Sequence, residues 1–168
     1  GVVEGGSTIT QQLARITYLS QERSVGRKLK EMLLARQIEQ TFDKPQILEK
    51  YLNLVYLGSG AYGLGDAAWV YFGKPVDKLT IAEAATLAGI VPAPSVYSPL
   101  ENPKLATERR NVAIKNMQEE GFITPSEAQA ALATPLVTNP QPLKRLEVKA
   151  PYFTQYVQNE LPKYLNEA

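Results

Sequence analysis

GGSTITQQLAR at residues 5–15 and RKLKE at residues 27–31 are the two most informative stretches of this 168-residue chain. In the first, polar side chains fill five of six neighbouring positions, which leaves little apolar surface for a core. In the second, Arg27 and Lys28 precede Glu31 by four and three residues, so a helix places all three on one face. Polar donors beside a cationic cluster suit an anionic, oxygen-rich ligand such as a phosphorylated sugar. The polar side chains of the first stretch belong to Ser7, Thr8, Thr10, Gln11 and Gln12.

Both stretches resemble the second and third sequence motifs of the peptidoglycan glycosyltransferases. These are the transglycosylase domains of class A penicillin-binding proteins and their monofunctional relatives. The resemblance covers nearly the whole chain with family-like spacing, whereas a single short motif would be only a hypothesis. It implies the lysozyme-like α fold of that family. The further matching stretches are ILEKYLN (47–53), GSGAYGLGDAAWVYFGK (58–74), LTIAEAATLAGIVPAPSVYSP (79–99) and ITPSEAQAAL (123–132).

Composition narrows the possible classes of protein. The chain is long enough, and at 44% hydrophobic content apolar enough, for one globular domain with its own core. Its net charge of +1 gives no case for nucleic acid, so any anion site must be a local cluster. The absence of cysteine and histidine excludes disulfides, a Ser-His-Asp triad and histidine metal sites. No apolar run approaches the ~18 residues of a membrane span.

Helical patterns dominate and predict an all-α domain, because no alternating strand pattern extends beyond a few residues. One helix is predicted from about residue 24 to residue 41. Its apolar residues fall roughly on one stripe, which predicts the face that packs on the core. That stripe consists of Leu29, Leu33, Ile38 and Phe42.

Local signals predict where several other helices begin and end. The spacing of Thr80 and Glu83, and of Thr124 and Glu127, predicts two helix-opening capping boxes. Pro45 suits a first helical position. The next long helix is predicted to open at Pro103 and to close at Gly121.

The glycines and aromatic residues after the helix that begins near Pro45 allow two interpretations. Residues 58–63 fit the dinucleotide fingerprint G-x-G-x-x-G, but a helical pattern rather than a strand precedes them. We therefore expect a tight turn there. Tyr62, Trp69, Tyr71 and Phe72 are predicted to be core residues rather than sugar-stacking platforms.

Residues 1–138 are predicted to form the glycosyltransferase domain, and residues 139–168 a linker toward an absent transpeptidase domain. Three prolines and little periodicity over 134–150 support the linker. Residues 152–165 are expected to form a last short helix. No Ser-x-x-Lys occurs, so the penicillin-reactive nucleophile of such domains is missing.

Glu31 is the candidate catalytic residue. Its charged neighbours alone also fit a solvated helix face, the commonest place for such residues. The resemblance instead implies that Glu31 is one of two acidic residues of the family's active site. There it would organise the donor's diphosphate, directly or through a divalent cation such as Mg²⁺ or Mn²⁺. The resemblance also implies that Arg27 and Lys28 stabilise charge developing on a lipid diphosphate leaving group.

The polar stretch before residue 15 has a structural and a functional interpretation, and the two are compatible. Ser7 or Thr8 is predicted to cap a helix through its side-chain oxygen. A helix N-terminus is itself favourable for an anion. The resemblance implies that this stretch, with Gln11, Gln12 and Arg15, lines the sugar and phosphate pocket.

The resemblance implies two further substrate-binding residues, Arg23 and Ser98. Arg23 matches a basic residue of the family that reaches the phosphate, although its type and position also fit an ordinary surface arginine. Ser98 lies in a proline-rich stretch that matches a family loop near the donor pocket. Many members have asparagine where this chain has Ser98, and lysine where it has Arg15.

The family's general base has no match in this sequence. The resemblance places it in a Glu-Asp-x-x-Phe-x-x-His motif upstream of GGSTITQQ. Because the chain opens on Gly1 rather than methionine, we expect an N-terminally truncated fragment. Because the general base is missing, we expect this fragment to be inactive alone. Glu4 is acidic and nearby but does not sit in such a motif.

The resemblance implies a parent enzyme that polymerises glycan chains from lipid II, the lipid-linked disaccharide, with inversion and release of polyprenyl diphosphate. Its partners would be lipid II, the growing glycan strand and the outer surface of the bacterial inner membrane. Ile16, Tyr18 and Leu19 are candidates for touching that surface, and ordinary burial is the alternative interpretation. Two alternatives stay open: a lysozyme-like lytic enzyme, which needs a carboxylic acid in a dry pocket, and a non-catalytic lipid-phosphate binding module.

Overall fold

The computed structural model describes residues 7–18 and 25–143. Regular structure in these two ranges is helical, which confirms the predicted all-α class, and the β pairing there is limited to an isolated bridge between Tyr56 and Tyr62. The last helix expected from the sequence, over residues 152–165, lies outside the described residues. The elements are α1 (Ile9–Tyr18), α2 (Val25–Thr41), α3 (Lys44–Leu54), α4 (Gly63–Phe72), the short 3₁₀ helix η1 (Val76–Lys78), α5 (Ile81–Ile90), α6 (Pro103–Glu119) and α7 (Pro125–Ala133).

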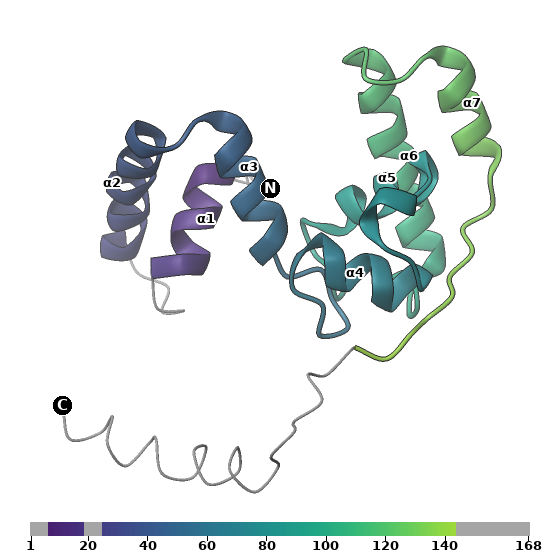
Figure 1. The fold of residues 1–168 in the computed structure, drawn as a ribbon, viewed down its shortest axis with the longest axis horizontal. Coiled ribbons are helices and arrows are strands. Elements are labelled where there is room, and N and C mark those ends of the chain that lie inside the picture. The colour runs from purple at the N-terminus through teal and green to yellow at the C-terminus, as the bar shows by residue number, and fades with distance from the viewer. Residues whose placement is uncertain (1–6, 19–24, 144–168) are drawn as a thin grey trace, which may run out of the picture.

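The helices form two groups that meet where α3 leads into α4 (Figure 1). The first group holds α1, α2 and α3, and the second holds α4 to α7. One apolar cluster runs through both groups, from Leu13 in α1 through Tyr51 in α3 to Ile90 in α5. A second cluster, centred on Ile114, joins α5, α6 and α7. The shared cluster therefore packs the two groups against each other at the α3–α4 junction.

Capping boxes open three of the helices. The two predicted ones are confirmed: Thr80 and Glu83 exchange backbone and side-chain hydrogen bonds at α5, and Thr124 and Glu127 do so at α7. Asp43 and Gln46 form a third box at α3, which the sequence analysis missed although the aspartate and glutamine have the required spacing. Because Asp43 is the cap, Pro45 occupies the second helical position rather than the first. The predicted limits of α6 are confirmed, since Pro103 opens it and Gly121, at φ +76°, follows its last turn.

Acid is expected to weaken the α5 cap through Glu83. Burial opposes ionisation of this carboxyl, but hydrogen bonds from Thr80 and Lys74 outweigh burial and lower its pKa. A carboxyl with a lowered folded pKa contributes stability that is complete above its unfolded pKa, about 4.3, and is lost as the pH falls through the folded value. Glu83→Gln keeps the box but does not titrate, so its free energy of unfolding should fall less between pH 6 and pH 3 than that of the parent. Urea unfolding across that range, with the exposed Glu49→Gln as control, tests this; equal falls in all three proteins would contradict it.

The face of α2 that packs inward differs from the predicted stripe. Leu29 and Leu33 are 59% and 58% exposed, so their assignment to the core is wrong. Ile38, the third residue of the predicted stripe, is buried as expected, but the residues buried with it are Glu31 and Ala35. These three lie four and three residues apart, which places them on one face of the helix. This face packs toward α1, and the Glu31 carboxylate buried on it is paired with two cations of its own helix.

The turn at residues 57–63 joins α3 to α4 and has no dinucleotide-binding context, because the helix α3 precedes it. Of the aromatic residues predicted as core, Tyr71 and Phe72 are buried and Trp69 is half-buried. The prediction is wrong for Tyr62, which is 62% exposed and packs its ring against Tyr56 at a centroid distance of 5.0 Å. Tyr62 belongs to the turn itself, so only one side of its ring finds protein to pack on.

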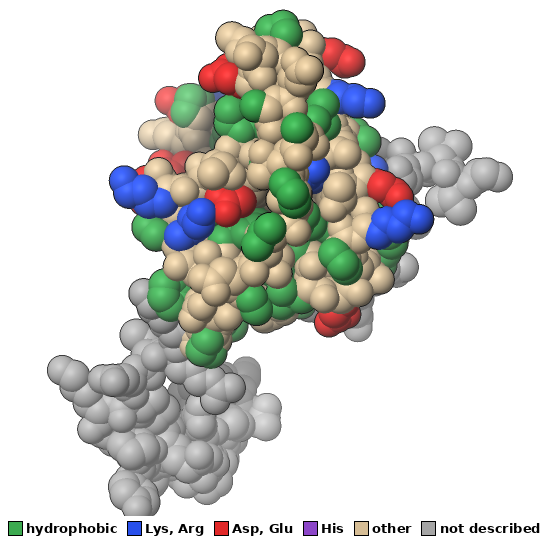
Figure 2. Space-filling view, turned by 90° about the vertical axis from the view of Figure 1, so that its right-hand side faces the viewer, with side chains coloured by type: hydrophobic (Ala, Val, Ile, Leu, Met, Phe, Trp, Pro, Cys, Tyr) green, Lys and Arg blue, Asp and Glu red, His purple; other side chains and the backbone are tan. Residues whose placement is uncertain are grey.

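The surface carries both signs of charge. On the face formed by the right-hand side of Figure 1, basic and acidic side chains are interspersed with apolar ones (Figure 2). In residues 7–18 and 25–143, no helix combines the length and the apolar composition that a membrane-crossing segment needs.

Candidate functional site

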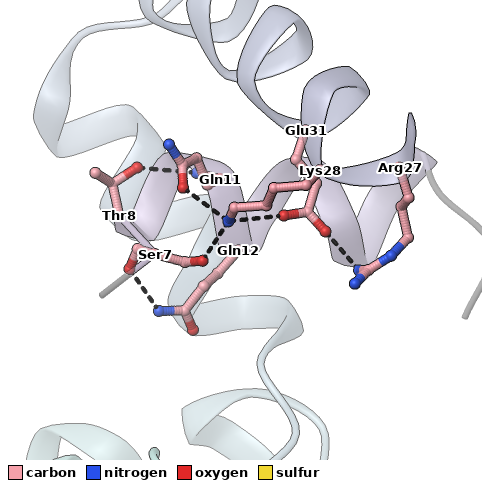
Figure 3. Close-up of polar contacts among 7 residues, drawn as sticks. All are labelled: Ser7, Thr8, Gln11, Gln12, Arg27, Lys28 and Glu31. Carbon is pink, nitrogen blue, oxygen red and sulfur yellow. Dashed lines mark hydrogen bonds and ion pairs between the residues drawn. The ribbon is translucent and has the colours of Figure 1, made fainter. Parts of the chain in front are cut away.

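The candidate site lies where the first turn of α1 meets the first turns of α2 (Figure 3). Thr8 precedes α1, and its side-chain oxygen accepts a hydrogen bond from the Gln11 backbone N–H at 3.2 Å, which confirms the predicted cap. The Gln12 side chain donates to the Ser7 carbonyl at 3.2 Å and holds that residue against the helix. Local capping therefore presents the polar side chains of α1 toward α2.

Lys28 is the centre of the site. Its ammonium group donates to Ser7 Oγ at 2.6 Å, to Gln11 Oε1 at 3.1 Å and to Glu31 Oε2 at 3.1 Å. An ammonium has three donors, so these three acceptors satisfy it (Figure 3). Two of the acceptors are neutral, and the Lys28 side chain is 45% exposed. An anion arriving from solvent can therefore replace Ser7 or Gln11 and form a stronger, charge-assisted hydrogen bond.

Glu31 is buried beneath the two cations. Its side chain is 3% exposed; one carboxylate oxygen accepts from Arg27 Nη1 at 2.5 Å and the other from Lys28. The solvated-face interpretation of Glu31 is therefore wrong. Arg27 and Lys28 outnumber the single carboxylate, so these three residues carry one net positive charge. Burying a carboxylate is costly unless it is paired, and here the pairing also fixes where both cations lie.

A second layer of contacts ties the site to α3. The Tyr51 hydroxyl donates to Gln12 Oε1 at 2.9 Å. Burial raises the pKa of Tyr51, and the nearby positive charge of Arg15 partly offsets that rise. Arg15 itself is exposed and lies near Tyr51. Tyr51 was not among the site residues predicted from the sequence, although it stands in the ILEKYLN stretch that carried part of the resemblance.

The remaining predicted positions lie elsewhere. Ser98 is 2% exposed and lies beside the buried Tyr71 hydroxyl. Burial raises the pKa of Tyr71, and its hydrogen bond with Ser59 partly offsets the rise. In this structure Ser98 thus contacts the protein interior and is not joined to the Lys28 cluster by any described hydrogen bond. Three other candidates lie outside the described residues: Arg23, the suspected base Glu4 and the membrane-contact candidate Leu19.

The described residues do not fit a resident Mg²⁺ or Mn²⁺ ion. Such ions bind carboxylate and other oxygen ligands. Both oxygens of Glu31 are already engaged by cations, which would also repel a divalent ion. Within residues 7–18 and 25–143, no three acidic side chains gather as a metal-binding group. The net positive charge of the cluster formed by Ser7, Gln11, Arg27, Lys28 and Glu31, called the anion cradle here, suits an anionic ligand instead.

Comparison with known proteins assigns the family. A family model described as Transglycosylase matches residues 1–118. Penicillin-binding protein 1A of Aquifex aeolicus is 55% identical over 135 residues, covering 80% of this chain and 19% of that protein. Penicillin-binding protein 1A of Escherichia coli is 46% identical over 158 residues, covering 94% of this chain and 18% of that protein.

The fold agrees with the sequence matches. A crystal structure of penicillin-binding protein 1A from Haemophilus influenzae superposes with a TM-score of 0.54 at 31% identity, over 93% of this chain and 20% of that one. The chain spans about a fifth of the length of these relatives. The family model matches most of the chain, and its helices follow those of a solved relative, so this chain belongs to the transglycosylase family.

Proposed function

We propose that this chain forms part of a peptidoglycan glycosyltransferase that polymerises glycan from lipid II and releases polyprenyl diphosphate. The observation that carries the proposal is the Lys28 ammonium, held between neutral acceptors on α1 and the buried Glu31 on α2. Such an arrangement suits a diphosphate, which offers several charged oxygens to one partly exposed cation. Membership of the transglycosylase family supports the same substrate class.

In this proposal the site acts on the leaving-group side of the reaction. When the sugar–oxygen bond breaks, negative charge grows on the departing diphosphate. Lys28 and Arg27 are already in place before that charge appears, so they stabilise it without reorganising. A phosphate oxygen replaces Ser7 or Gln11 as an acceptor of the Lys28 ammonium, and both residues remain beside the phosphate as neutral polar groups.

Glu31 is proposed as a positioning residue for the two cations. Its burial keeps it away from the solvent side from which Lys28 is reached. A carboxylate bonded to both cations holds their donors a short distance apart, as two phosphate oxygens require. This role uses the carboxylate itself and no metal ion.

We propose the extracytoplasmic surface of the bacterial inner membrane as the place of action, since a lipid-linked substrate resides there. Ile16 and Tyr18, exposed by 41% and 67% at the end of α1, support contact with that surface. An apolar side chain and an amphipathic ring together suit a membrane interface. The growing glycan strand is the second proposed partner.

Lys28→Ala is expected to weaken binding of a prenyl diphosphate, with farnesyl diphosphate as probe, by about tenfold or more. The estimate follows from losing one charge-assisted hydrogen bond worth about 1.5–3 kcal/mol. Lys30→Ala is the matched control, because Lys30 is exposed on the same helix and its loss changes net charge equally. Isothermal titration calorimetry should give parent-like affinity for Lys30→Ala. Equal affinity in all three proteins would remove Lys28 from the site.

A reaction assay separates the enzyme classes. The protein encoded by the full reading frame that contains this chain should convert lipid II to polymer and release polyprenyl diphosphate. Hydrolysis of finished peptidoglycan without polymer would favour a lytic enzyme, and diphosphate binding with neither product would favour a binding module.

A further inference from the structure

Residues 134–143, called the strap here, return from the end of α7 to α4 (Figure 1). The sequence analysis predicted a linker from residue 139 onward, yet the described part of that linker is held against the domain. At its start, Arg110, which is 2% exposed, donates to the Thr134 carbonyl at 2.8 Å. At its end, the Trp69 indole N–H donates to the Pro142 carbonyl at 2.9 Å. Both ends of the strap are thus fixed by side chains of the helical body.

Between these ends the strap completes the last turn of α4. The backbone N–H groups of Asn139 and Gln141 donate to the carbonyls of Tyr71 and Val70 at 2.9 and 3.1 Å. Carbonyls in the last turn of a helix have no partner inside it, so the strap supplies what α4 lacks. The approach is close at Gly73, where a Cβ atom would lie 2.8 Å from Nδ2 of the Asn139 side chain.

Helix α4 in turn holds the turn at residues 57–61. The buried Tyr71 hydroxyl donates to the Leu57 carbonyl at 2.8 Å and lies 3.3 Å from Ser59 Oγ. Gly58, Ser59 and Gly60 all have positive φ, of 86°, 51° and 77°. A positive φ is unfavourable for a serine and persists only when the surroundings impose it. Tyr71 is one such constraint, because it bonds the turn from inside the core.

The strap also reaches this turn directly. Leu143 packs against the main apolar cluster, and its Cδ1 would lie 3.2 Å from a Cβ atom at Gly60. Just beyond the turn, the first residue of α4 is bound to the end of α3, since the Gly63 N–H donates at 2.8 Å to the carbonyl of Val55, which follows that helix. The turn therefore lies between the strap and the helix whose Tyr51 contacts the candidate site.

We propose that the strap is a clamp on the joint between the two groups of helices, and not a passive linker. By completing α4 and covering Gly60, it holds the turn at 57–61 in its strained form. That turn sets how α3, with the anion cradle behind it, sits against α4. Whatever the chain carries after Leu143 is thereby tied mechanically to the joint. The strap holds this joint whichever ligand the anion cradle binds.

Two shortened chains test the clamp. One ends after Leu143 and keeps the strap; the other ends after Thr138 and removes the part that contacts α4. Trp69 is the only tryptophan in the sequence, so its fluorescence reports directly on the strap. The shorter chain should show red-shifted emission and about tenfold or faster hydrogen exchange at the Leu57 and Ala61 amides, which bond within the turn. The longer one should match the 168-residue protein in both measurements, and equal behaviour of the two would overturn the proposal.

Trp69→Phe in the 168-residue protein gives a test that does not depend on a truncated chain folding. It keeps a ring in place but removes the donor to Pro142. Exchange should accelerate at the Asn139 and Gln141 amides of the strap and, through the clamp, at Leu57 and Ala61. Faster exchange in the strap with an unchanged turn would show that the strap does not hold the turn.

Discussion

Glu31→Gln is expected to lower the rate of lipid II polymerisation by about a hundredfold or more. The rate is measured on the protein encoded by the full reading frame that contains this chain. Glutamine has nearly the size of glutamate, so packing on α2 is retained. It cannot accept two charge-assisted hydrogen bonds, however, and Arg27 and Lys28 lose the carboxylate that fixes their spacing. The diphosphate then meets cations that must be ordered during the reaction, and that reordering raises the barrier.

The matched control is Glu39→Gln, which removes the same charge from an exposed position of the same helix. It should polymerise like the parent. Circular dichroism and thermal unfolding of the Glu31 variant must show a folded protein before its activity is interpreted. Activity of the folded variant within about threefold of the parent would mean that Glu31 does not position the cations.

Gly63→Ala is expected to lower the free energy of unfolding by about 3 kcal/mol, which corresponds to a fall of roughly 10 °C in melting temperature. Gly63 has φ +81°, a conformation that L-residues with a side chain rarely adopt. A Cβ atom there would lie 2.5 Å from the Asn53 carbonyl oxygen. The backbone of α3 cannot step aside easily, because the same junction is closed by the bond from Gly63 to Val55.

Gly65→Ala, two residues further along α4, is the control. A Cβ atom there meets nothing within 4 Å and the backbone needs no positive φ. Alanine in a helix is favoured over glycine, so this variant should be more stable by about 0.5–1 kcal/mol. Thermal unfolding of both variants decides the matter. Similar melting temperatures for the two would show that the α3–α4 junction tolerates a side chain.

Local hydrogen bonds explain why much of the fold could be predicted from the sequence. The capping boxes at Thr80 and Thr124 each connect residues three apart, so their spacing is visible in the sequence. The trio of Arg27, Lys28 and Glu31 could be placed on one helix face for the same reason. The buried face of α2 could not be predicted in this way. Leu29 and Glu31 lie on different faces of the helix, and the sequence does not say which face meets α1.

The sequence by itself determined the all-α class, the family, most helix limits and the central residues of the candidate site. Each of these depends on side chains within about one turn of each other or on motifs read along the chain. Only the tertiary structure decided that Glu31 is buried and that Ser98 faces Tyr71. It also revealed the bonds from Tyr51 to Gln12 and from Trp69 to Pro142, which join residues 39 and 73 positions apart. Such contacts are created by how the helices pack, and no local spacing records them.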